Sequence, residues 1–292
     1  MKIGIISDIH SNYYALKTVI AFLEGQHIDV LICAGDFVGY GPQPKECVNF
    51  FLYYPISHYF CLGNHDIGVR FRYSDYYHQE PIKQDHKILK TFNFRESAAE
   101  MLDRNAQDIQ EDHFQFLFNL PFKQIFQLDH KKFYLTHGTP SLRRRENVGK
   151  YLLPPPLQDP RVTIDRLKND KKAVSADIII IGHTHRRFLI ARDNFYSWSL
   201  IEDILDKKPT KFPLKFPFNK NRIILNPGSI GQPRDGTGNA SFVVIDLDDE
   251  ILEFCDLEYQ MKNFYRLAKE KCAPGLQDSS FWANKFGYFS KE

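Results

Sequence analysis

Five short polar motifs follow apolar runs along the chain, and their side chains are of the kinds that bind metal ions. They are Asp8-Ile9-His10, Gly35-Asp36, Gly63-Asn64-His65-Asp66, Thr136-His137-Gly138 and Gly182-His183-Thr184-His185. Together they supply three carboxylates, one amide oxygen and five imidazoles. Such a set suits two adjacent metal ions with one acid beside them, an arrangement typical of phosphate-ester hydrolysis. A lone histidine is more often structural than a ligand, but five in this ordered set are hard to explain as core residues.

The spacing within two of the motifs indicates paired ligands. Asp8 and His10 are two residues apart at the end of an apolar run, and His183 and His185 repeat that spacing. In an extended strand, residues i and i+2 point to the same face, so we expect each pair to address one locus. Carboxylates combined with neutral imidazoles suit manganese, iron or zinc, whereas magnesium prefers oxygen ligands. The motifs therefore predict a centre of two divalent ions of the former kind.

Short apolar strands and the helices between them are expected to position these motifs. Strands are predicted at 2–7, 30–34 and 59–62, and helices after Ser11 or Asn12 and over 44–52. This β-α-β-α-β order predicts a largely parallel sheet with helices on its faces. Each of the first three motifs follows the carboxyl end of a strand, where open α/β sheets bind their ligands.

The remainder of the chain predicts further strands around a helical segment. Residues 67–120 carry an aromatic stretch and two helix-like segments, at about 92–104 and 110–118, which we interpret as a helical insertion beside the site. The further strands are predicted at 132–136, 178–181, 188–191, 223–225, 242–247 and 251–257. Of these, 188–191 is expected to return antiparallel to 178–181. A helix from about 260, a break at Pro274-Gly275 and a packed aromatic end complete a single predicted domain over 1–292.

The composition is that of a soluble globular protein, and it disfavours several other classes. A net charge of +2 over 292 residues gives no nucleic-acid or acidic-membrane surface. No apolar run reaches the ~20 residues of a membrane span, and a cleavable signal peptide would remove Asp8 and His10. The five cysteines are odd in number and form no Cys-x-x-Cys pair, which predicts a reduced, cytoplasmic protein without disulfides. The oligomeric state stays open.

The five motifs in this order resemble those of the calcineurin-like metallophosphoesterase superfamily. Residues 35–44 (GDFVGYGPQP) and 226–236 (NPGSIGQPRDG) resemble a prokaryotic branch of small phosphodiesterases and phosphatases within it. The resemblance runs from residue 1 to about 245. It implies an α/β fold in which a β-sandwich of two mixed sheets is flanked by helices, with a dimetal site at the strand ends.

The resemblance also implies a role for each polar side chain of the motifs. The ligands of one metal ion would be Asp8, His10, Asp36 and His185. Asp36 would bridge to a second ion, whose remaining ligands would be Asn64, His137 and His183. His65 would be a general acid rather than a ligand, and Asp66 would orient it. An acidic neighbour of this kind also helps an imidazole to stay protonated beside two cations.

The expected reaction follows from this arrangement. Metal binding lowers the pKa of water from about 15.7 to about 7, so a water bridging two ions loses its proton near neutral pH. The resulting hydroxide attacks phosphorus in line, while the metals neutralise charge on the non-bridging oxygens. His65 protonates the leaving alkoxide, an effect worth about 10²–10⁴ in rate. We therefore predict a dimetal phosphodiesterase or phosphatase that acts on a small phosphoester such as a nucleotide.

Three residues are candidates for contact with the substrate. In the second motif, protein phosphatases and symmetric dinucleoside tetraphosphatases of the superfamily usually carry Gly-Asp-x-Val-Asp-Arg-Gly. Here Tyr40 stands where the phosphate-gripping arginine would be, and stacking on a leaving group or simple packing would both suit an aromatic ring. Arg144, within the run 143–145, and Arg234 offer guanidinium groups that match phosphate oxygens. A solvated surface is the alternative for the arginine run.

Three other functions are compatible with the same fold and are weighed against this one. A dinucleoside polyphosphate hydrolase is an alternative within the same chemistry. A non-catalytic metal-binding scaffold is an alternative of another class, because the retromer scaffold subunit resembles this superfamily but lacks a complete catalytic set. A nuclease would need a nucleic-acid surface, which the charge does not provide. The complete set of ligands together with His65 favours the enzyme.

Overall fold

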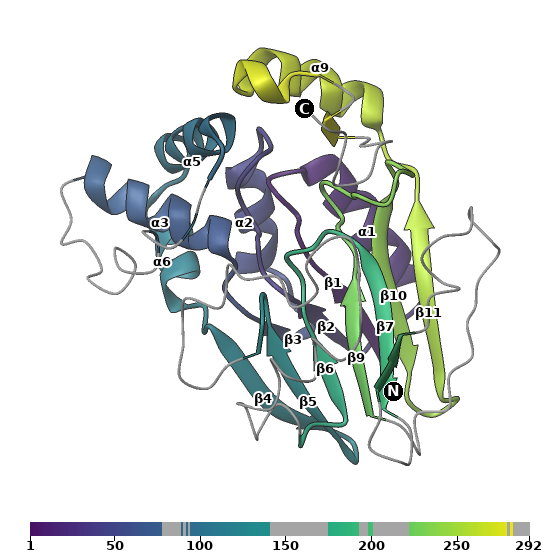
Figure 1. Ribbon diagram of the computed structural model, residues 1–292. Coiled ribbons are helices and arrows are strands. Elements are labelled where there is room, and N and C mark those ends of the chain that lie inside the picture. The colour runs from purple at the N-terminus through teal and green to yellow at the C-terminus, as the bar shows by residue number, and fades with distance from the viewer. Residues whose placement is uncertain are drawn as a thin grey trace.

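Two mixed β-sheets pack face to face in the computed structural model, which describes residues 1–77, 89, 92, 94–140, 175–192, 198–200, 222–278, 281 and 282. Their facing side chains form one apolar cluster, to which Ile5 and Ile32 contribute from one sheet and Leu135 and Leu225 from the other. A second apolar cluster lies between the first sheet and the helices. The predicted sandwich of two mixed sheets flanked by helices is confirmed (Figure 1).

The first sheet has the strand order β11-β10-β1-β2-β3. Its strands are β1 (Lys2–Ile6), β2 (Val30–Cys33), β3 (Ser57–Phe60), β10 (Ala240–Asp246) and β11 (Ile251–Leu257). β1, β2 and β3 are parallel, as their helical crossovers require, and β10 and β11 join antiparallel at the β1 edge. The parallel opening predicted from the first sixty residues is therefore correct.

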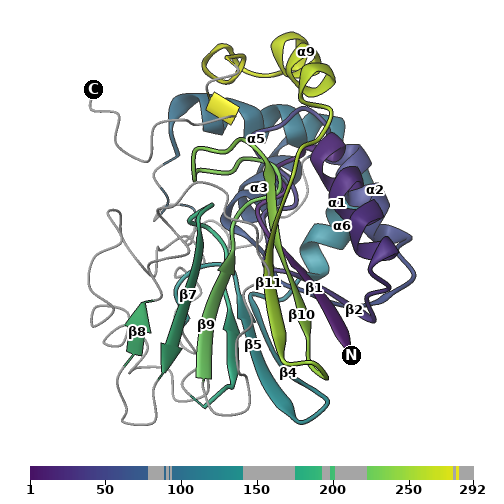
Figure 2. The same ribbon diagram turned by 90° about the vertical axis from the view of Figure 1, so that its right-hand side faces the viewer.

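The second sheet has the order β4-β5-β6-β9-β7-β8. Its strands are β4 (Lys123–Leu128), β5 (Lys131–Thr136), β6 (Ile178–Ile180), β7 (Arg187–Arg192), β8 (Trp198–Leu200) and β9 (Arg222–Pro227). Here one prediction needs correction. β7 does run antiparallel, but it pairs with β9 (Figure 2), and β9 lies between β6 and β7 (Figure 1).

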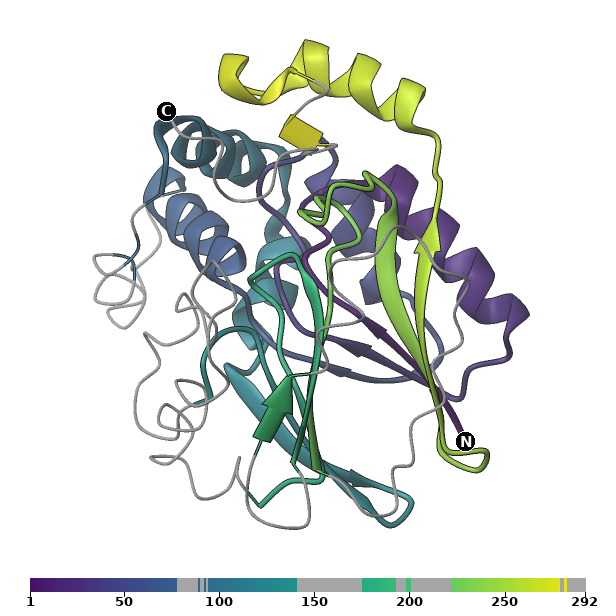
Figure 3. The same ribbon diagram turned by 45° about the vertical axis from the view of Figure 1, so that its right-hand side comes forward.

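Helices cover the outer face of the first sheet and extend beyond its carboxyl ends. They are α1 (Tyr13–Gly25), α2 (Pro44–Leu52), α3 (Asn64–Tyr76), α5 (Glu96–Asp108), α6 (Glu111–Asn119) and α9 (Met261–Lys271), with the short 3₁₀ helix η3 (Pro274–Leu276). α1 begins after Asn12, whose side chain accepts a hydrogen bond from Ala15 N, so one of the two predicted caps is correct. α9 lies across the end of the molecule opposite the N-terminus (Figure 3).

The predicted helical segment at 67–120 contains three described helices rather than two. α5 and α6 match the expected pair, although α5 starts at Glu96 and not near 92. α3 was not predicted, and it begins inside the third motif, at Asn64. Whether this segment is an insertion in a single domain stays a prediction.

Phe281 and Trp282, the described part of the predicted aromatic end, pack on the helical layer, and 283–292 lie outside the described residues. The indole of Trp282 is fully buried, donates from Nε1 to Leu276 O at 2.9 Å, and lies edge-on to the Phe264 ring at 4.7 Å. Phe281 reaches the ring of Tyr40 at 5.4 Å. Among the described residues, no helix has both the length and the apolar character needed to cross a membrane.

Candidate metal centre

The polar motifs meet at one edge of the sandwich because they follow parallel strands that end there. The first two motifs follow β1 and β2 of one sheet, and the last two follow β5 and β6 of the other. The third motif leaves β3 and opens α3. The carboxyl ends of parallel strands share one edge, so packing the two sheets together brings all five loops to one place.

A first cluster joins Asp8, His10 and His185. The Nε2 atoms of His10 and His185 are 3.0 Å apart, and Asp8 Oδ1 lies 3.4 Å from His185 Nε2 and 3.7 Å from His10 Nε2. All three residues are buried. One oxygen and two imidazole nitrogens thus face a common point, as the ligands of a divalent ion do.

A second cluster joins Asp36, His137 and His183, with Asn64 beside it. His137 Nε2 lies 3.2 Å from Asp36 Oδ2 and 3.1 Å from Asn64 Oδ1. Asp36 Oδ2 is also only 3.6 Å from His10 Nε2 of the first cluster. The carboxylate of Asp36 therefore lies between the two clusters, where a ligand shared by two ions would be.

Hydrogen bonds to backbone carbonyls orient the rings of His137 and His185 so that Nε2 of each faces the clusters. His137 Nδ1 is 2.6 Å from Ala34 O, and His185 Nδ1 is 2.7 Å from Gln232 O. A carbonyl accepts only from an N–H, so Nδ1 carries a proton in both rings and Nε2 is the nitrogen that a metal ion would bind. Histidines that bind metal ions are commonly oriented by such hydrogen bonds to backbone carbonyls.

Each carboxylate has one satisfied oxygen and one that faces the clusters. Asp8 Oδ2 accepts from Ser7 Oγ at 2.6 Å and from His183 N at 3.1 Å, and Asp36 Oδ1 accepts from His65 N at 2.8 Å. In the described part of the chain, no backbone N–H, amide or hydroxyl donates to the buried Asp8 Oδ1 or Asp36 Oδ2, and the polar atoms beside them are imidazole nitrogens of the clusters. A buried anionic oxygen without a donor is costly unless a cation compensates it. The donor set therefore fits two divalent ions.

The sequence carries a family signature that agrees with this geometry. A family model described as the calcineurin-like phosphoesterase superfamily domain matches residues 1–250. The chain belongs to this superfamily. Members of it typically bind divalent metals, and the two clusters offer candidate ligands for them.

Relatives of known sequence or structure are consistent with this membership. An uncharacterized protein of Methanocaldococcus jannaschii is 28% identical over 280 residues, which cover 96% of this chain and 97% of that protein. A metallophosphoesterase from Sphaerobacter thermophilus has a TM-score of 0.67 at 24% identity, covering 97% of this chain and all of its own. A hypothetical protein from Pyrococcus horikoshii OT3 has a TM-score of 0.68 at 15% identity, covering 98% and 99%. The two structural likenesses show the fold alone.

The backbone of the ligand loops differs from the extended strands assumed for the spacing argument. Asp8 and His10 have φ values of 53° and 48°, and His183 and His185 have φ values of 67° and 57°. Left-handed conformations cost non-glycine residues about 1–2 kcal/mol each, and such strain gathers at functional sites. Asp8 and His10 do meet at one locus. His183 and His185 instead turn to different clusters, so the expectation that they address one locus is wrong.

His65 and Asp66 lie beside the clusters, but their contacts differ from those expected. Asp66 was expected to orient the His65 imidazole. Its carboxylate instead accepts from the backbone N–H groups of Asp36, Val38 and Gly63 at 2.8–3.1 Å. Asp66 thus ties the second motif to the third and caps α3. Burial lowers the pKa of His65 to about 4, so this imidazole is neutral at neutral pH in the metal-free protein.

The imidazoles that face the clusters are mostly uncharged. Burial lowers the pKa of His10, His183 and His185 well below the usual value, which leaves their nitrogens available to a metal. Burial acts in the same direction on His137, but the carboxylate of Asp36 outweighs it and raises the pKa of His137 to about 9. In the metal-free protein, the positive charge of protonated His137 therefore partly compensates the buried carboxylate of Asp36, as a bound cation would.

Metal uptake at neutral pH is expected to release protons. The metal-free protein carries a proton on His137 below the pKa of about 9, and an imidazole must lose this proton before it can bind a metal ion. Metal affinity should therefore fall as the pH is lowered, and proton release from this group should fade as the pH rises through about 9. Calorimetric titration with manganese in buffers of different ionisation enthalpy measures the protons released. A heat that is independent of the buffer at neutral pH would contradict this prediction.

The structure locates two of the three candidate substrate contacts. The Tyr40 ring lies 4.4 Å from the His65 ring and 4.7 Å from the His10 ring, centroid to centroid. Arg234 donates from its backbone to His185 O and from its guanidinium to Gln232 Oε1, and its charge lowers the pKa of His185. Both residues thus border the clusters. Arg144 lies outside the described residues.

The segment 226–236 supports the ligand loops through hydrogen bonds. The Asn226 amide donates to Gly182 O at 2.7 Å and to Thr184 Oγ1 at 3.0 Å. Ser229 Oγ donates to Asp8 O at 2.7 Å. Neither these two residues nor Ser7 belongs to the five motifs predicted to bind metal ions. Asn226 lies near the end of β9, Ser229 lies in the glycine-containing turn that follows, and Ser7 comes directly after β1.

Proposed function

We propose that this protein is a metal-dependent hydrolase of phosphate esters with a two-ion centre. The observation that carries the proposal is the placement of Asp36, whose buried Oδ2 lies 3.2 Å from His137 Nε2 in one cluster and 3.6 Å from His10 Nε2 in the other. Two neighbouring sets of ligand atoms that share a carboxylate are typical of two-metal hydrolases, which act on phosphate esters. Superfamily membership supports the same class of reaction.

The ligand atoms divide naturally between two ions. One would be held by Asp8, His10 and His185, and the other by Asn64, His137 and His183, with Asp36 shared. Bound divalent ions would supply Lewis acidity and an activated water nucleophile near neutral pH. The mixed imidazole and carboxylate set suits manganese, iron or zinc.

The chain itself contributes the proton for the leaving group through His65. This side chain is 4% exposed, and its ring is 4.8 Å from that of His10, at the border of the first cluster. Its lowered pKa means that it is neutral before substrate binds. The negative charge of a bound phosphate ester raises the pKa of a neighbouring imidazole, so the substrate itself would favour the protonated form. His65 then donates that proton to the departing oxygen.

Arg234 and Tyr40 are proposed to bind the substrate at the border of the centre. The guanidinium of Arg234 would offer donors to the phosphate oxygens, and the ring of Tyr40 would contact the leaving group. A small phosphoester such as a nucleotide is the proposed substrate. The five cysteines are buried free thiols, which supports a reducing, cytoplasmic location.

Hydrolysis by the purified protein tests the proposal. The protein is stripped with a chelator, resupplied with manganese, iron or zinc, and assayed with p-nitrophenyl phosphate, bis-p-nitrophenyl phosphate and a dinucleoside polyphosphate. Turnover that returns only with metal is expected, and the ratio of diester to monoester rates then selects substrates for screening. Bound metal without hydrolysis of any of these esters would contradict the proposal and favour a metal-binding scaffold.

A further inference from the structure

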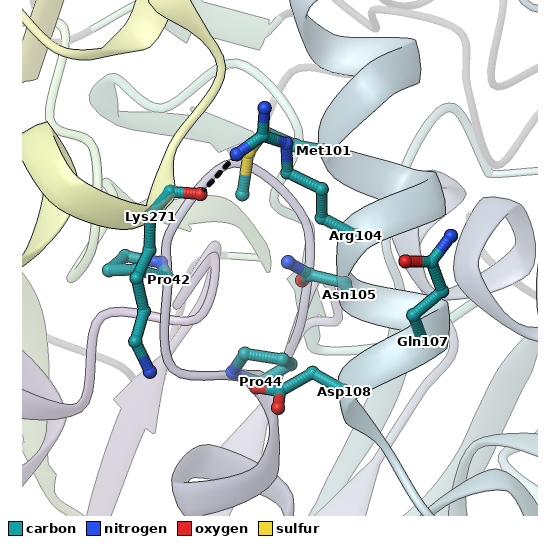
Figure 4. Close-up of a pocket in the computed structure, with 8 residues that line it drawn as sticks. All are labelled: Pro42, Pro44, Met101, Arg104, Asn105, Gln107, Asp108 and Lys271. Carbon is teal, nitrogen blue, oxygen red and sulfur yellow. Dashed lines mark hydrogen bonds between the residues drawn. The ribbon is translucent and has the colours of Figure 1, made fainter.

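Asn105 is a buried polar residue of α5 that the reaction described above does not use. Its side chain is 1% exposed, and it makes three hydrogen bonds to the loops that carry the first two motifs. Oδ1 accepts from Ser11 Oγ at 2.7 Å and from Gly39 N at 2.9 Å, and Nδ2 donates to Gly41 O at 3.1 Å. Figure 4 shows the Asn105 amide beside the loop that carries Pro42 and Pro44, at a pocket of about 380 Å³ between α5, α2 and α9.

The loop that Asn105 holds is in direct contact with two imidazoles of the site. A Cβ on Gly39, whose φ is +135°, would lie 2.7 Å from His65 Nδ1 and 2.8 Å from His10 Nδ1. The next residue, Tyr40, packs its ring against both of these histidines, and Gly41 N donates to His10 O at 2.9 Å. A displacement of 39–41 would therefore move both imidazoles.

Only a side chain with both an acceptor and a donor makes this set of bonds. The acceptor oxygen joins Gly39 to Ser11, the residue after His10, and so adds to the direct hydrogen bonds between the two loops, such as Gly39 N to Ser11 Oγ at 3.2 Å. The donor nitrogen completes the contact at Gly41. Aspartate would present an anion to the Gly41 carbonyl, and leucine would leave three buried groups without this partner.

We propose that Asn105 is a positioning residue that holds the 39–41 loop against His10 and His65. The expected effect of Asn105 on the reaction rate rests on the proposed function. The hydrogen bonds from Asn105 to the 39–41 loop do not depend on that function. Displacement of a catalytic group by about 1 Å can cost about 10²-fold in rate. Loss of Asn105 should therefore slow the hydrolysis of esters that need proton donation from His65 more than that of esters that do not.

The test compares Asn105→Leu and Asn105→Ala with Met101→Ala, a matched control. Met101 is buried on the same helix one turn earlier, packs beside the same pocket and accepts from Ala273 N through its sulfur. Its truncation therefore loosens α5 without removing a bond to the 39–41 loop. Two readouts are measured after melting curves establish that each variant is folded. One is backbone hydrogen exchange over 37–43 in the metal-free protein, and the other is the rate ratio of p-nitrophenyl to phenyl phosphate esters with metal.

Both Asn105 variants are expected to exchange faster over 37–43 than Met101→Ala and to lose about tenfold to 100-fold in turnover of the phenyl ester. The p-nitrophenyl ester should be affected less, because its leaving group needs less help from an acid. Exchange and rate ratios equal to those of Met101→Ala would overturn the proposal. So would failure of both Asn105 variants to fold while Met101→Ala folds, since Asn105 would then serve stability. Absence of hydrolysis by the unmodified protein would overturn the proposed function, while hydrogen exchange would still decide the role of Asn105.

Discussion

Replacement of Asp36 by asparagine is expected to lower metal occupancy and abolish turnover together. The substitution keeps the shape of the side chain and its acceptor for His65 N, but it removes the charge that lies between His10 and His137. Both ions would lose their shared anionic ligand. Metal ions stabilise the transition state by several kcal/mol, so the loss of turnover should reach about 10³-fold or more.

Metal content by mass spectrometry and the rate of ester hydrolysis measure the two effects side by side. Asp177→Asn is a suitable control, because this carboxylate accepts a backbone hydrogen bond from Lys132 N at the amino end of β6, away from the clusters. The control should keep its metal and its activity. An Asp36→Asn protein that keeps two ions per chain and full turnover would show that Asp36 is not a shared ligand.

Replacement of His65 by alanine is expected to leave the metal content unchanged and to reduce turnover by about 10²–10⁴ for poor leaving groups. The imidazole borders the clusters, and its backbone N–H, which alanine retains, is what holds Asp36 Oδ1. Esters with good leaving groups should lose less, because they need no proton at the departing oxygen. The dependence of rate on leaving-group pKa in the two proteins measures this difference.

A second buried histidine provides the control for this substitution. His113 is 1% exposed on α6 and is 2.9 Å from Asn49 Oδ1 through Nε2, away from the clusters. His113→Ala should cost stability without changing the leaving-group dependence. If His65→Ala instead empties the centre, His65 is a ligand, a role that its position within 4.8 Å of ligand atoms of His10 and Asp36 would permit.

The elements that carry a strong local signal could be predicted from the sequence. β1 and β2 are short, β-branched and buried, and α2 spans the predicted residues because Pro44 occupies its first turn. The second sheet was predicted less well. β4 (KQIFQL) shows no regular alternation of polar and apolar side chains and is only partly buried, so its pattern does not distinguish a strand from a loop. α3 lacks a clear apolar face because most of its first eleven residues are buried, polar ones included.

The convergence of the five motifs was predictable, whereas their local geometry was not. Strand order alone places Asp8, Asp36 and His137 at one edge of the sandwich. The left-handed turns at Asp8, His10, His183 and His185 depend on tertiary contacts, such as the bond from Asn226 Nδ2 to Gly182 O, that no local pattern encodes. Asn105 could not be found for the same reason, since its partners are 64 to 94 residues away in the chain.

Anomalous diffraction from crystals grown with manganese tests the two-ion centre. Two manganese peaks are expected, one beside Asp8, His10 and His185 and the other beside Asn64, His137 and His183. Both peaks should lie within bonding distance of the Asp36 carboxylate. A single peak, or two peaks that do not share Asp36, would contradict the two-ion centre on which the proposed hydrolysis depends.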